Sequence, residues 1–206
     1  MKRFLTTFFS CSIILAFTSS ALANKPVKVK VFQDAFVQGG GTADEALGST
    51  TSGRLRVMKS NGDDKYSRTT YLQFNLKKIE DFETVDLNVC VRVYPSKVDA
   101  SATFTMQVYG NGNAKWNESA ITFNNKPEKG EILTSKEFKA NDNNDWVKIS
   151  IPADAMKELL KNSKKGRITL VLSNDDFNKT SAEIISKERT WSNGSLAKRE
   201  AYLSFQ

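Results

Sequence analysis

The feature that most constrains the fold of this chain is a strict alternation of apolar and polar residues in short segments. The clearest case is Val85 to Tyr94, VDLNVCVRVY, in which the valines and Leu87 share one parity and polar side chains fill the other. Successive side chains of a β-strand point to opposite faces, so this pattern predicts a strand with one buried face. Pro95 ends the strand, because proline cannot donate a hydrogen bond to the ladder.

Comparable segments recur along the chain at near-regular spacing. We predict about nine strands, at residues 24–31, 55–58, 68–76, 85–94, 103–109, 146–151, 167–173, 182–187 and 200–205. One helix is predicted from Pro152 to Asn162, because proline suits a first helical turn and Gly166 follows the basic end. Residues 116–130 read as loop. Many short strands with one helix favour an all-β fold, an antiparallel sandwich or barrel, over alternating βα units.

The N-terminus has the pattern of a secretory signal peptide. Lys2 and Arg3 precede an apolar run from Phe4 to Phe17, and Ala21-Leu22-Ala23 is a small-residue cleavage site. We therefore expect a signal peptide at residues 1–23, a single domain at residues 24–206, and secretion to the periplasm or the extracellular space. No transmembrane segment is expected to remain after cleavage. Removing Lys2 and Arg3 leaves 28 basic and 23 acidic residues, a net charge of +5, which favours a polyanionic partner.

Two residue types are informative by their scarcity. The chain has no histidine, which excludes Ser-His and Cys-His nucleophile pairs and histidine-ligated zinc. Only Cys90 follows the predicted signal peptide, so no intramolecular disulfide is expected, and we interpret Cys90 as a buried structural residue. These absences lower the expectation of catalysis, and we predict a protein that is not an enzyme.

The stretch from Arg54 to Leu76 suggests where a ligand binds. It reads as two strands joined by a turn at Asn61 to Asp64, each with one apolar and one polar side. If the strands of this region share one sheet, their polar parity forms a basic face with tyrosines, made of Arg54, Arg56, Tyr71, Gln73, Arg92, Gln107 and Tyr109. Guanidinium forks match carboxylates, and tyrosine can stack on a sugar ring. The alternative is an ordinary solvated strand face. Arg68 has the parity of the apolar side, so we expect it to turn inward, toward a carboxylate.

The order of segments resembles a known family. FQDAFVQGG, RLRVMKS, RTTYLQFNL, VDLNVCVRVYP, WNESAITFNNKPEKGEIL, IISKE and AYLSF follow one another as in the DNRLRE-type domain, carbohydrate-binding module family 96. Asn75 stands where the family has aspartate, and Phe123 where it often has tryptophan. The resemblance covers essentially the whole predicted mature chain. It implies a β-sandwich of jelly-roll type, secreted, that binds acidic polysaccharide such as alginate through a basic surface.

Together these observations predict a secreted, non-catalytic module for acidic polysaccharide. We expect Arg54, Arg56, Tyr71, Gln73, Arg92, Tyr109 and Lys187 to contact the ligand, without nucleic acid as a partner and with separate polysaccharide-degrading enzymes as candidate partners. The first alternative is a structural or adhesive subunit of a matrix or cell envelope. The second is a lyase that uses tyrosine and arginine, for which no spacing marks a site.

Some residues have two interpretations. Lys187-Glu188 resembles a lysine-glutamate pair of the family and reads as an internal ion pair or a ligand contact. Trp116, with Ile121, Phe123 and Pro127, favours packing, as does Trp146, whereas Trp191 is the more plausible exposed aromatic. No cofactor is required. A structural calcium that ties Asp34 to a later loop is the one candidate metal, because calcium binds oxygen ligands.

Overall fold

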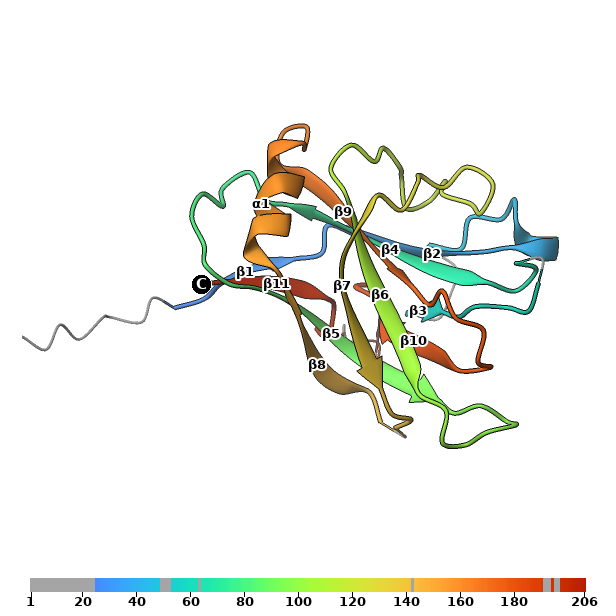
Figure 1. Cartoon of the computed structure of the whole chain (residues 1–206). Coiled ribbons are helices and arrows are strands. Elements are labelled where there is room, and N and C mark those ends of the chain that lie inside the picture. The colour runs from blue at the N-terminus through green and yellow to red at the C-terminus, as the bar shows by residue number, and fades with distance from the viewer. Residues whose placement is uncertain (1–24, 49–52, 63, 142, 191–193, 195–196) are drawn as a thin grey trace, which may run out of the picture.

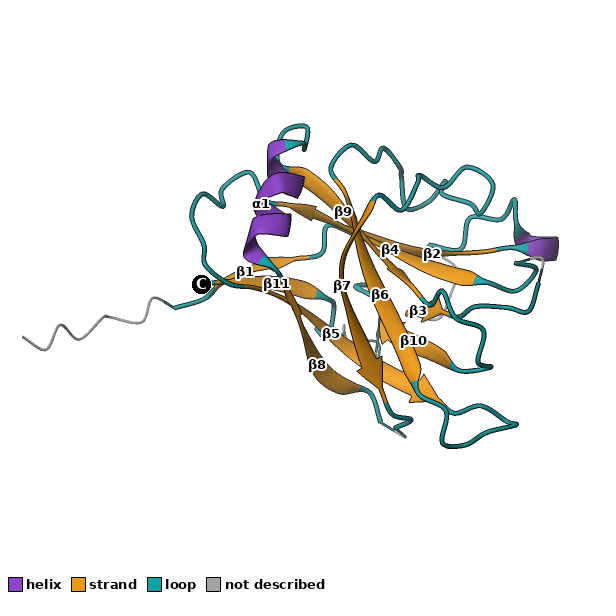
Figure 2. Ribbon diagram, in the orientation of Figure 1, coloured by secondary structure: helices purple, strands orange, loops and turns teal. Residues whose placement is uncertain are grey.

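The computed structural model describes residues 25–48, 53–62, 64–141, 143–190, 194 and 197–206, so the predicted signal peptide and Trp191 lie outside the described residues. In these ranges the chain forms strands joined by loops, with one α-helix and one 3-10 turn (Figure 2). The strands are β1 (Val27–Lys30), β2 (Gln33–Gln38), β3 (Arg54–Val57), β4 (Arg68–Asn75), β5 (Val85–Tyr94), β6 (Phe104–Asn111), β7 (Glu131–Phe138), β8 (Asp145–Ile151), β9 (Arg167–Ser173), β10 (Ser181–Ile185) and β11 (Tyr202–Phe205). The 3-10 turn is η1 (Gly40–Thr42).

Two antiparallel sheets form a sandwich, which confirms the predicted all-β fold with one short helix (Figure 1). The first, called sheet A, has the order β1-β11-β5-β10-β3, with β8 on the other edge of β5. The second, sheet B, has the order β2-β4-β9-β6-β7. In sheet A, β5 is central, because β8 pairs along one edge while β11 and β10 pair in succession along the other.

The main core lies between the inner faces of the sheets. Alternate residues of β5, such as Leu87 and Val91, meet Leu72 and Phe74 of β4, and all four are buried. Burying such a side chain contributes about 1.5–3 kcal/mol. The strict alternation of β5 therefore fixes which of its side chains face outward: Asp86, Asn88, Cys90, Arg92 and Tyr94. Cys90 is nevertheless buried, as predicted, because Asn144 and Arg199 cover it.

The helix α1 (Ala153–Lys161) lies at one end of the sandwich (Figure 1). Its apolar face places Met156 and Leu159 in the main core. The C-terminal strand β11 lies between β1 and β5, so the two ends of the described chain are neighbours in sheet A. No helix within the described ranges is long and apolar enough to span a membrane.

The structure adds two strands that the pattern of residues did not predict. Strand β2 has no alternation because both of its faces are covered: Ala35 and Val37 on one side, Asp34 and Phe36 on the other. Strand β7 is an edge strand of sheet B, largely exposed, and lacks an apolar face. The two strands of the Arg54–Leu76 stretch also belong to different sheets, connected by an isolated bridge between Met58 and Arg68.

Candidate functional site

The predicted binding residues do not share one face. Arg54, Arg56 and Arg92 lie in sheet A, whereas Tyr71, Gln73, Gln107 and Tyr109 lie in sheet B. Lys187 follows β10 in a loop. The expectation of a single sheet was wrong because β3 and β4, adjacent in sequence, pair with different partners. The polar parity of each strand was predicted, but the strand order divides the residues between opposite sides of the sandwich.

The arginines of sheet A converge on one carboxylate. Glu183 in β10 lies between Arg56 of β3 and Arg92 of β5 in the register of the sheet. Arg54 forms an ion pair with Glu183, and the Nε of Arg56 lies 3.6 Å from Glu183 Oε1. We define the arginine cluster as Arg54, Arg56, Arg92, Tyr94 and Glu183. Three guanidinium groups against one carboxylate give this cluster a net charge of +2.

Arg92 is stacked on an aromatic ring. Its guanidinium carbon lies 4.7 Å from the ring centroid of Tyr94, a cation–π contact. Its buried Nε has no hydrogen-bond partner among the described residues. The Tyr94 hydroxyl donates to Glu183 Oε2 at 2.8 Å, which fixes the ring under Arg92. Burial and this hydrogen bond raise the pKa of Tyr94, so its hydroxyl stays protonated at neutral pH.

A groove opens beside the arginine cluster, with a volume of about 240 Å³. Arg56, Tyr94, Ser181 and Glu183 line it together with Arg68 of β4. Arg68 turns inward as expected, but its Nε donates to the amide oxygen of Gln38 at 2.6 Å and not to a carboxylate. Burial, then the charge of Arg56, lower the pKa of Arg68. The groove therefore presents two guanidinium groups, those of Arg56 and Arg68, to any carboxylate that enters it.

Two aromatic side chains extend the same outer face of sheet A. Trp146 of β8 and Tyr202 of β11 lie on either side of β5, with ring centroids 5.5 Å apart in an edge-to-face arrangement. Trp146 is 46% exposed, so the prediction that it packs inside was wrong: its parity places it opposite Cys90, on the outer face. Lys28 Nζ lies 4.9 Å from the ring centroid of Tyr202. A basic, aromatic surface thus continues along β5 beyond the arginine cluster.

In sheet B, Tyr71 of β4 is buried instead of exposed on the outer face. Tyr71 is fully buried, against Ala35, Val37, Ile121 and Val171, in a second apolar cluster outside sheet B. The loop that follows β6 covers it, and the Tyr71 hydroxyl donates to the carbonyl of Pro127 at 3.1 Å. Burial raises the pKa of Tyr71 above its ordinary range. Tyr71 is therefore part of a core.

Trp116 closes this second cluster, as predicted from its apolar neighbours. Its ring lies edge-on to Tyr71, with centroids 6.1 Å apart, and its Nε1 donates to Thr169 Oγ1 at 3.0 Å. Phe123 packs against the same cluster. The loop from Trp116 to Gly130 is thus fixed over the outer face of sheet B by apolar burial and hydrogen bonds.

The other polar residues of sheet B have internal partners. Gln73 is buried and accepts a hydrogen bond from Gln33 Nε2 at 2.9 Å. Tyr109 donates to Asp175, and Lys129 Nζ binds the same carboxylate at 2.6 Å. Burial and the bond to Asp175 raise the pKa of Tyr109 to about 12.

A groove of about 480 Å³ runs past Tyr71 and Tyr109 on sheet B. Its charged lining is mixed: Lys126 and Lys129 stand with Glu128 and Glu131. Because Lys129 is also neutralised by Asp175, this groove has no basic excess for a polyanion. The arginine cluster, with a net positive charge, is the stronger candidate.

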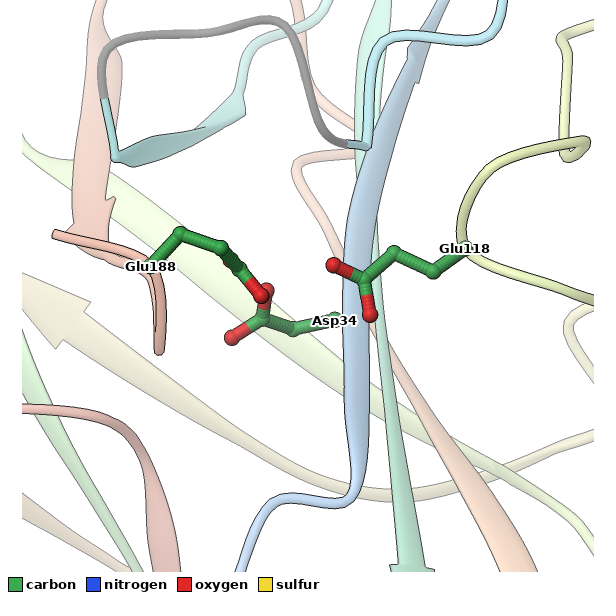
Figure 3. Close-up of side chains that lie close together, drawn as sticks. All are labelled: Asp34, Glu118 and Glu188. Atoms are coloured by element: carbon green, nitrogen blue, oxygen red, sulfur yellow. The ribbon is translucent and has the colours of Figure 1, made fainter.

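Lys187 belongs to a separate cluster of acidic residues. Its Nζ lies 2.9 Å from Glu118 Oε1 and forms an ion pair with Glu188. Its backbone N–H donates to Asp34 Oδ2 at 2.9 Å. The interpretation of Lys187-Glu188 as an internal ion pair is confirmed, while contact with a ligand stays a prediction. Figure 3 shows the carboxylates of Asp34, Glu118 and Glu188 brought together from three parts of the chain.

Sequence reasoning did not select two members of the arginine cluster. Tyr94 was placed on the outer parity of β5 but not among the ligand contacts, although it follows Arg92 by two residues on the same face. Glu183 gave no signal, because a single acidic residue in a short strand is common on sheet surfaces. Only the pairing of β10 with both β3 and β5 shows that Glu183 lies between arginines.

Two solved structures and one family model match the chain. Among solved structures, the Agl-KA catalytic domain matches with a TM-score of 0.36 and 11% identity, over 88% of this chain and 27% of that chain. The N-terminal endo-1,4-beta-D-xylanase 10B of Clostridium thermocellum, solved as CBM22-1-GH10 modules complexed with xylohexaose, matches with a TM-score of 0.32 and 12% identity, over 88% and 28% of the two chains. This chain thus spans little more than a quarter of either structure.

No curated protein matches the chain. The model of carbohydrate-binding module family 96, however, matches residues 25–197. That range contains the whole second apolar cluster, the acidic cluster around Lys187 and every residue of the arginine cluster. The match confirms the resemblance to the DNRLRE-type domain, and it covers most of the chain. The protein belongs to carbohydrate-binding module family 96 and is a non-catalytic carbohydrate-binding module by class.

Proposed function

We propose that this module binds an acidic polysaccharide, of alginate type or another uronate polymer, through the arginine cluster of sheet A. The observation that carries the proposal is Arg92. Its guanidinium is stacked over Tyr94, and Arg92 lies opposite Glu183 in the register of β5 and β10, yet its buried Nε has no hydrogen-bond partner in the described chain. A buried donor without a partner is costly, and a ligand carboxylate would satisfy it.

The geometry suits an extended acidic ligand. Arg56, Glu183 and Arg92 form a row across three strands, and the groove beside them admits a carboxylate. Trp146 and Tyr202 lie farther along β5, so a second sugar ring has an aromatic surface to contact. Four residues of a strand span about 13 Å, the separation of Asn88 and Arg92 along β5. This length favours a polymer over a single sugar.

The expected binding is weak and sensitive to salt. Exposed charge pairs contribute about 0.2–1 kcal/mol each, so four or five pairs give roughly 1–5 kcal/mol. Millimolar affinity corresponds to about 4 kcal/mol, so these pairs alone give dissociation constants of millimolar order or weaker, and we expect micromolar values only where several units of one polymer are bound. Repeated uronates along one polymer strengthen retention, because a released site rebinds a neighbouring unit.

We also propose that the module acts outside the cytoplasm. The signal peptide predicted at residues 1–23 would export the module to the periplasm or the extracellular space, where acidic polysaccharides and the enzymes that degrade them occur. Mass spectrometry of the exported protein tests the export: an N-terminus at Asn24 supports it, and an intact Met1 in the cytoplasmic fraction contradicts it.

Affinity electrophoresis tests the binding. The folded protein is run through gels that contain alginate, pectate, heparin or a neutral polysaccharide, at low and high salt. We expect retardation by a uronate polymer that salt reduces, because ions screen exposed charges. A folded protein that no polyanion retards would contradict the proposal. If solution mass then rises with concentration into ordered oligomers, the structural or adhesive alternative gains support.

A further inference from the structure

Three carboxylates converge at the edge of sheet B, from residues other than those of the arginine cluster. Asp34 lies in β2, Glu118 in the loop that covers the second apolar cluster, and Glu188 in the segment after β10. One oxygen of each lies within 4.8 Å of the others. In Figure 3 the carboxylates of Asp34 and Glu188 adjoin, and that of Glu118 faces them from the neighbouring loop. Distant parts of the sequence thus meet at one acidic point.

The contacts in this cluster leave carboxylate oxygens unsatisfied. Asp34 has no exposed surface, and its Oδ1 has no hydrogen-bond partner. Glu188 Oε2 is also buried without a partner in the described chain. One carboxylate oxygen of Glu118 and one of Glu188 lie within 4.8 Å of each other. Ionised carboxylates so close together repel one another. The Lys187 ammonium offsets the repulsion between Glu118 and Glu188 only in part, because one positive charge faces three carboxylates, and a further cation or a proton would offset the rest.

The charge of the cluster indicates which cation fits. Lys187 contacts it through ion pairs with Glu118 and Glu188. Three carboxylates and one ammonium leave a net charge of −2, which one divalent ion neutralises. The donors are all oxygens, which favours a hard ion over zinc. Calcium accepts carboxylates in both one-oxygen and two-oxygen modes and tolerates irregular geometry, unlike magnesium.

We propose that Asp34, Glu118 and Glu188 bind one calcium ion, with Lys187 as the remaining counter-charge. The ion joins β2, the loop from Trp116 to Gly130 and the segment after β10, three parts that no disulfide connects. Its role is structural, and the site is separate from the polysaccharide surface. Protons are the competing occupants: burial, then the charge of Glu188, raise the pKa of Asp34 to about 8.

Thermal melting of the full chain tests the site. The protein is treated with a chelator, dialysed, and melted with calcium chloride, with magnesium chloride and with neither. Calcium in about hundred-fold excess over its dissociation constant should raise Tm by about 5–10 °C. The variants Asp34→Asn and Glu188→Gln should lose this shift. Glu200→Gln is the matched control, because it removes a carboxylate that pairs with Lys30 outside the cluster, and it should keep the shift.

Isothermal titration with calcium provides a readout that does not depend on the melting of each variant. One ion per chain is expected for the wild type and for Glu200→Gln, and none for Glu188→Gln. If Asp34→Asn does not fold, the calcium titrations of Glu188→Gln and Glu118→Gln test the proposal in its place. Equal Tm with and without calcium would overturn the proposal and assign the cluster to bound protons. A shift with magnesium alone would overturn the choice of calcium.

Discussion

At the residue scale, Glu183 occupies the position that a ligand carboxylate would compete for. It pairs with Arg54, approaches Arg56 and accepts the hydroxyl of Tyr94, and only 16% of its side chain is exposed. An internal carboxylate keeps neighbouring arginines in place in the absence of ligand. It also repels an incoming anion, so the proposed site has a built-in competitor.

Replacing this competitor should strengthen binding. We expect Glu183→Gln to tighten the binding of a uronate polymer about 2- to 10-fold at low salt, because a like charge is removed while the guanidinium groups stay. The measurement is retardation in alginate gels. The control is Glu137→Gln on the exposed strand β7 of sheet B, which makes the same change in net charge. Equal effects of the two variants would show that only total charge matters.

Asp175 illustrates a carboxylate with an internal role. Burial alone raises its pKa, but hydrogen bonds from Lys129, Ser173 and Tyr109 bring the pKa below its ordinary value of 3.8. Because the pKa of Asp175 is lower in the folded state, its ionised carboxylate stabilises the folded protein fully at pH values well above 3.8. This stabilisation is lost as the pH falls through the pKa of the folded state.

The variant Asp175→Asn should therefore lower the free energy of unfolding at pH 7 by about 1–2 kcal/mol, a range reduced by the partial exposure of this side chain. Urea denaturation of variant and wild type at pH 7 and at pH 3 measures the difference. We expect the difference to shrink at pH 3. A difference that is unchanged at both pH values would contradict the role of the ionised carboxylate.

At the scale of elements, the loop from Trp116 to Gly130 determines what sheet B does. It lies over the outer face of the sheet and removes Tyr71 from solvent. A polar parity in sequence therefore does not guarantee an exposed face, because a long loop can cover it. This is why Tyr71 was expected at a ligand surface and lies in a core.

The variant Tyr71→Phe tests this assignment. It removes the hydrogen bond to Pro127 and keeps the ring, so we expect a loss of about 0.5–1.5 kcal/mol in the free energy of unfolding. Polysaccharide retardation should be unchanged. Reduced retardation with unchanged stability would return Tyr71 to the binding surface.

Whether a strand could be predicted from the sequence depended on how many of its faces are buried. Strands with one buried face, such as Val85–Tyr94, were predicted with their bounds because alternation reports burial directly. Strand β2 was missed because both of its faces are buried, and β7 because it is an exposed edge. The helix was predicted to within a residue at each end, since Pro152 and Asn162 flank Ala153–Lys161.

At the scale of the whole molecule, strand order decides which polar residues meet. Sequence determined the parity of Arg56, Arg92 and Tyr109, but parity is a local property. Whether these residues share a face depends on long-range pairing, which placed Tyr109 in sheet B and the two arginines in sheet A. The acidic cluster was also beyond prediction as a set: Asp34 was identified, but its approach to Glu118 and Glu188 arises from the packing of three distant segments.

The sandwich itself depends on the central strand of sheet A. Leu87 of β5 is fully buried in the main core. We expect Leu87→Ala to lower the free energy of unfolding by about 2–5 kcal/mol, because it leaves a cavity between the sheets. Urea denaturation measures the change. A loss below about 1 kcal/mol would contradict the central position assigned to β5.

The most direct test of the proposed function compares two arginines on opposite sheets. Arg92 belongs to the arginine cluster, and Arg167 begins β9 in sheet B, where its guanidinium lies 5.5 Å from the ring of Phe32. The variants Arg92→Ala and Arg167→Ala make the same change in net charge. Their dissociation constants for an alginate oligomer are measured by isothermal titration at low salt, after both are shown to fold.

We predict that Arg92→Ala weakens binding about 5- to 30-fold, a loss of about 1–2 kcal/mol, because a hydrogen bond from a partly buried guanidinium to a carboxylate is worth more than an exposed pair, while Arg167→Ala stays within about 2-fold of the wild type. Equal weakening by the two variants, or wild-type affinity in Arg92→Ala, would contradict the assignment of polysaccharide binding to the arginine cluster.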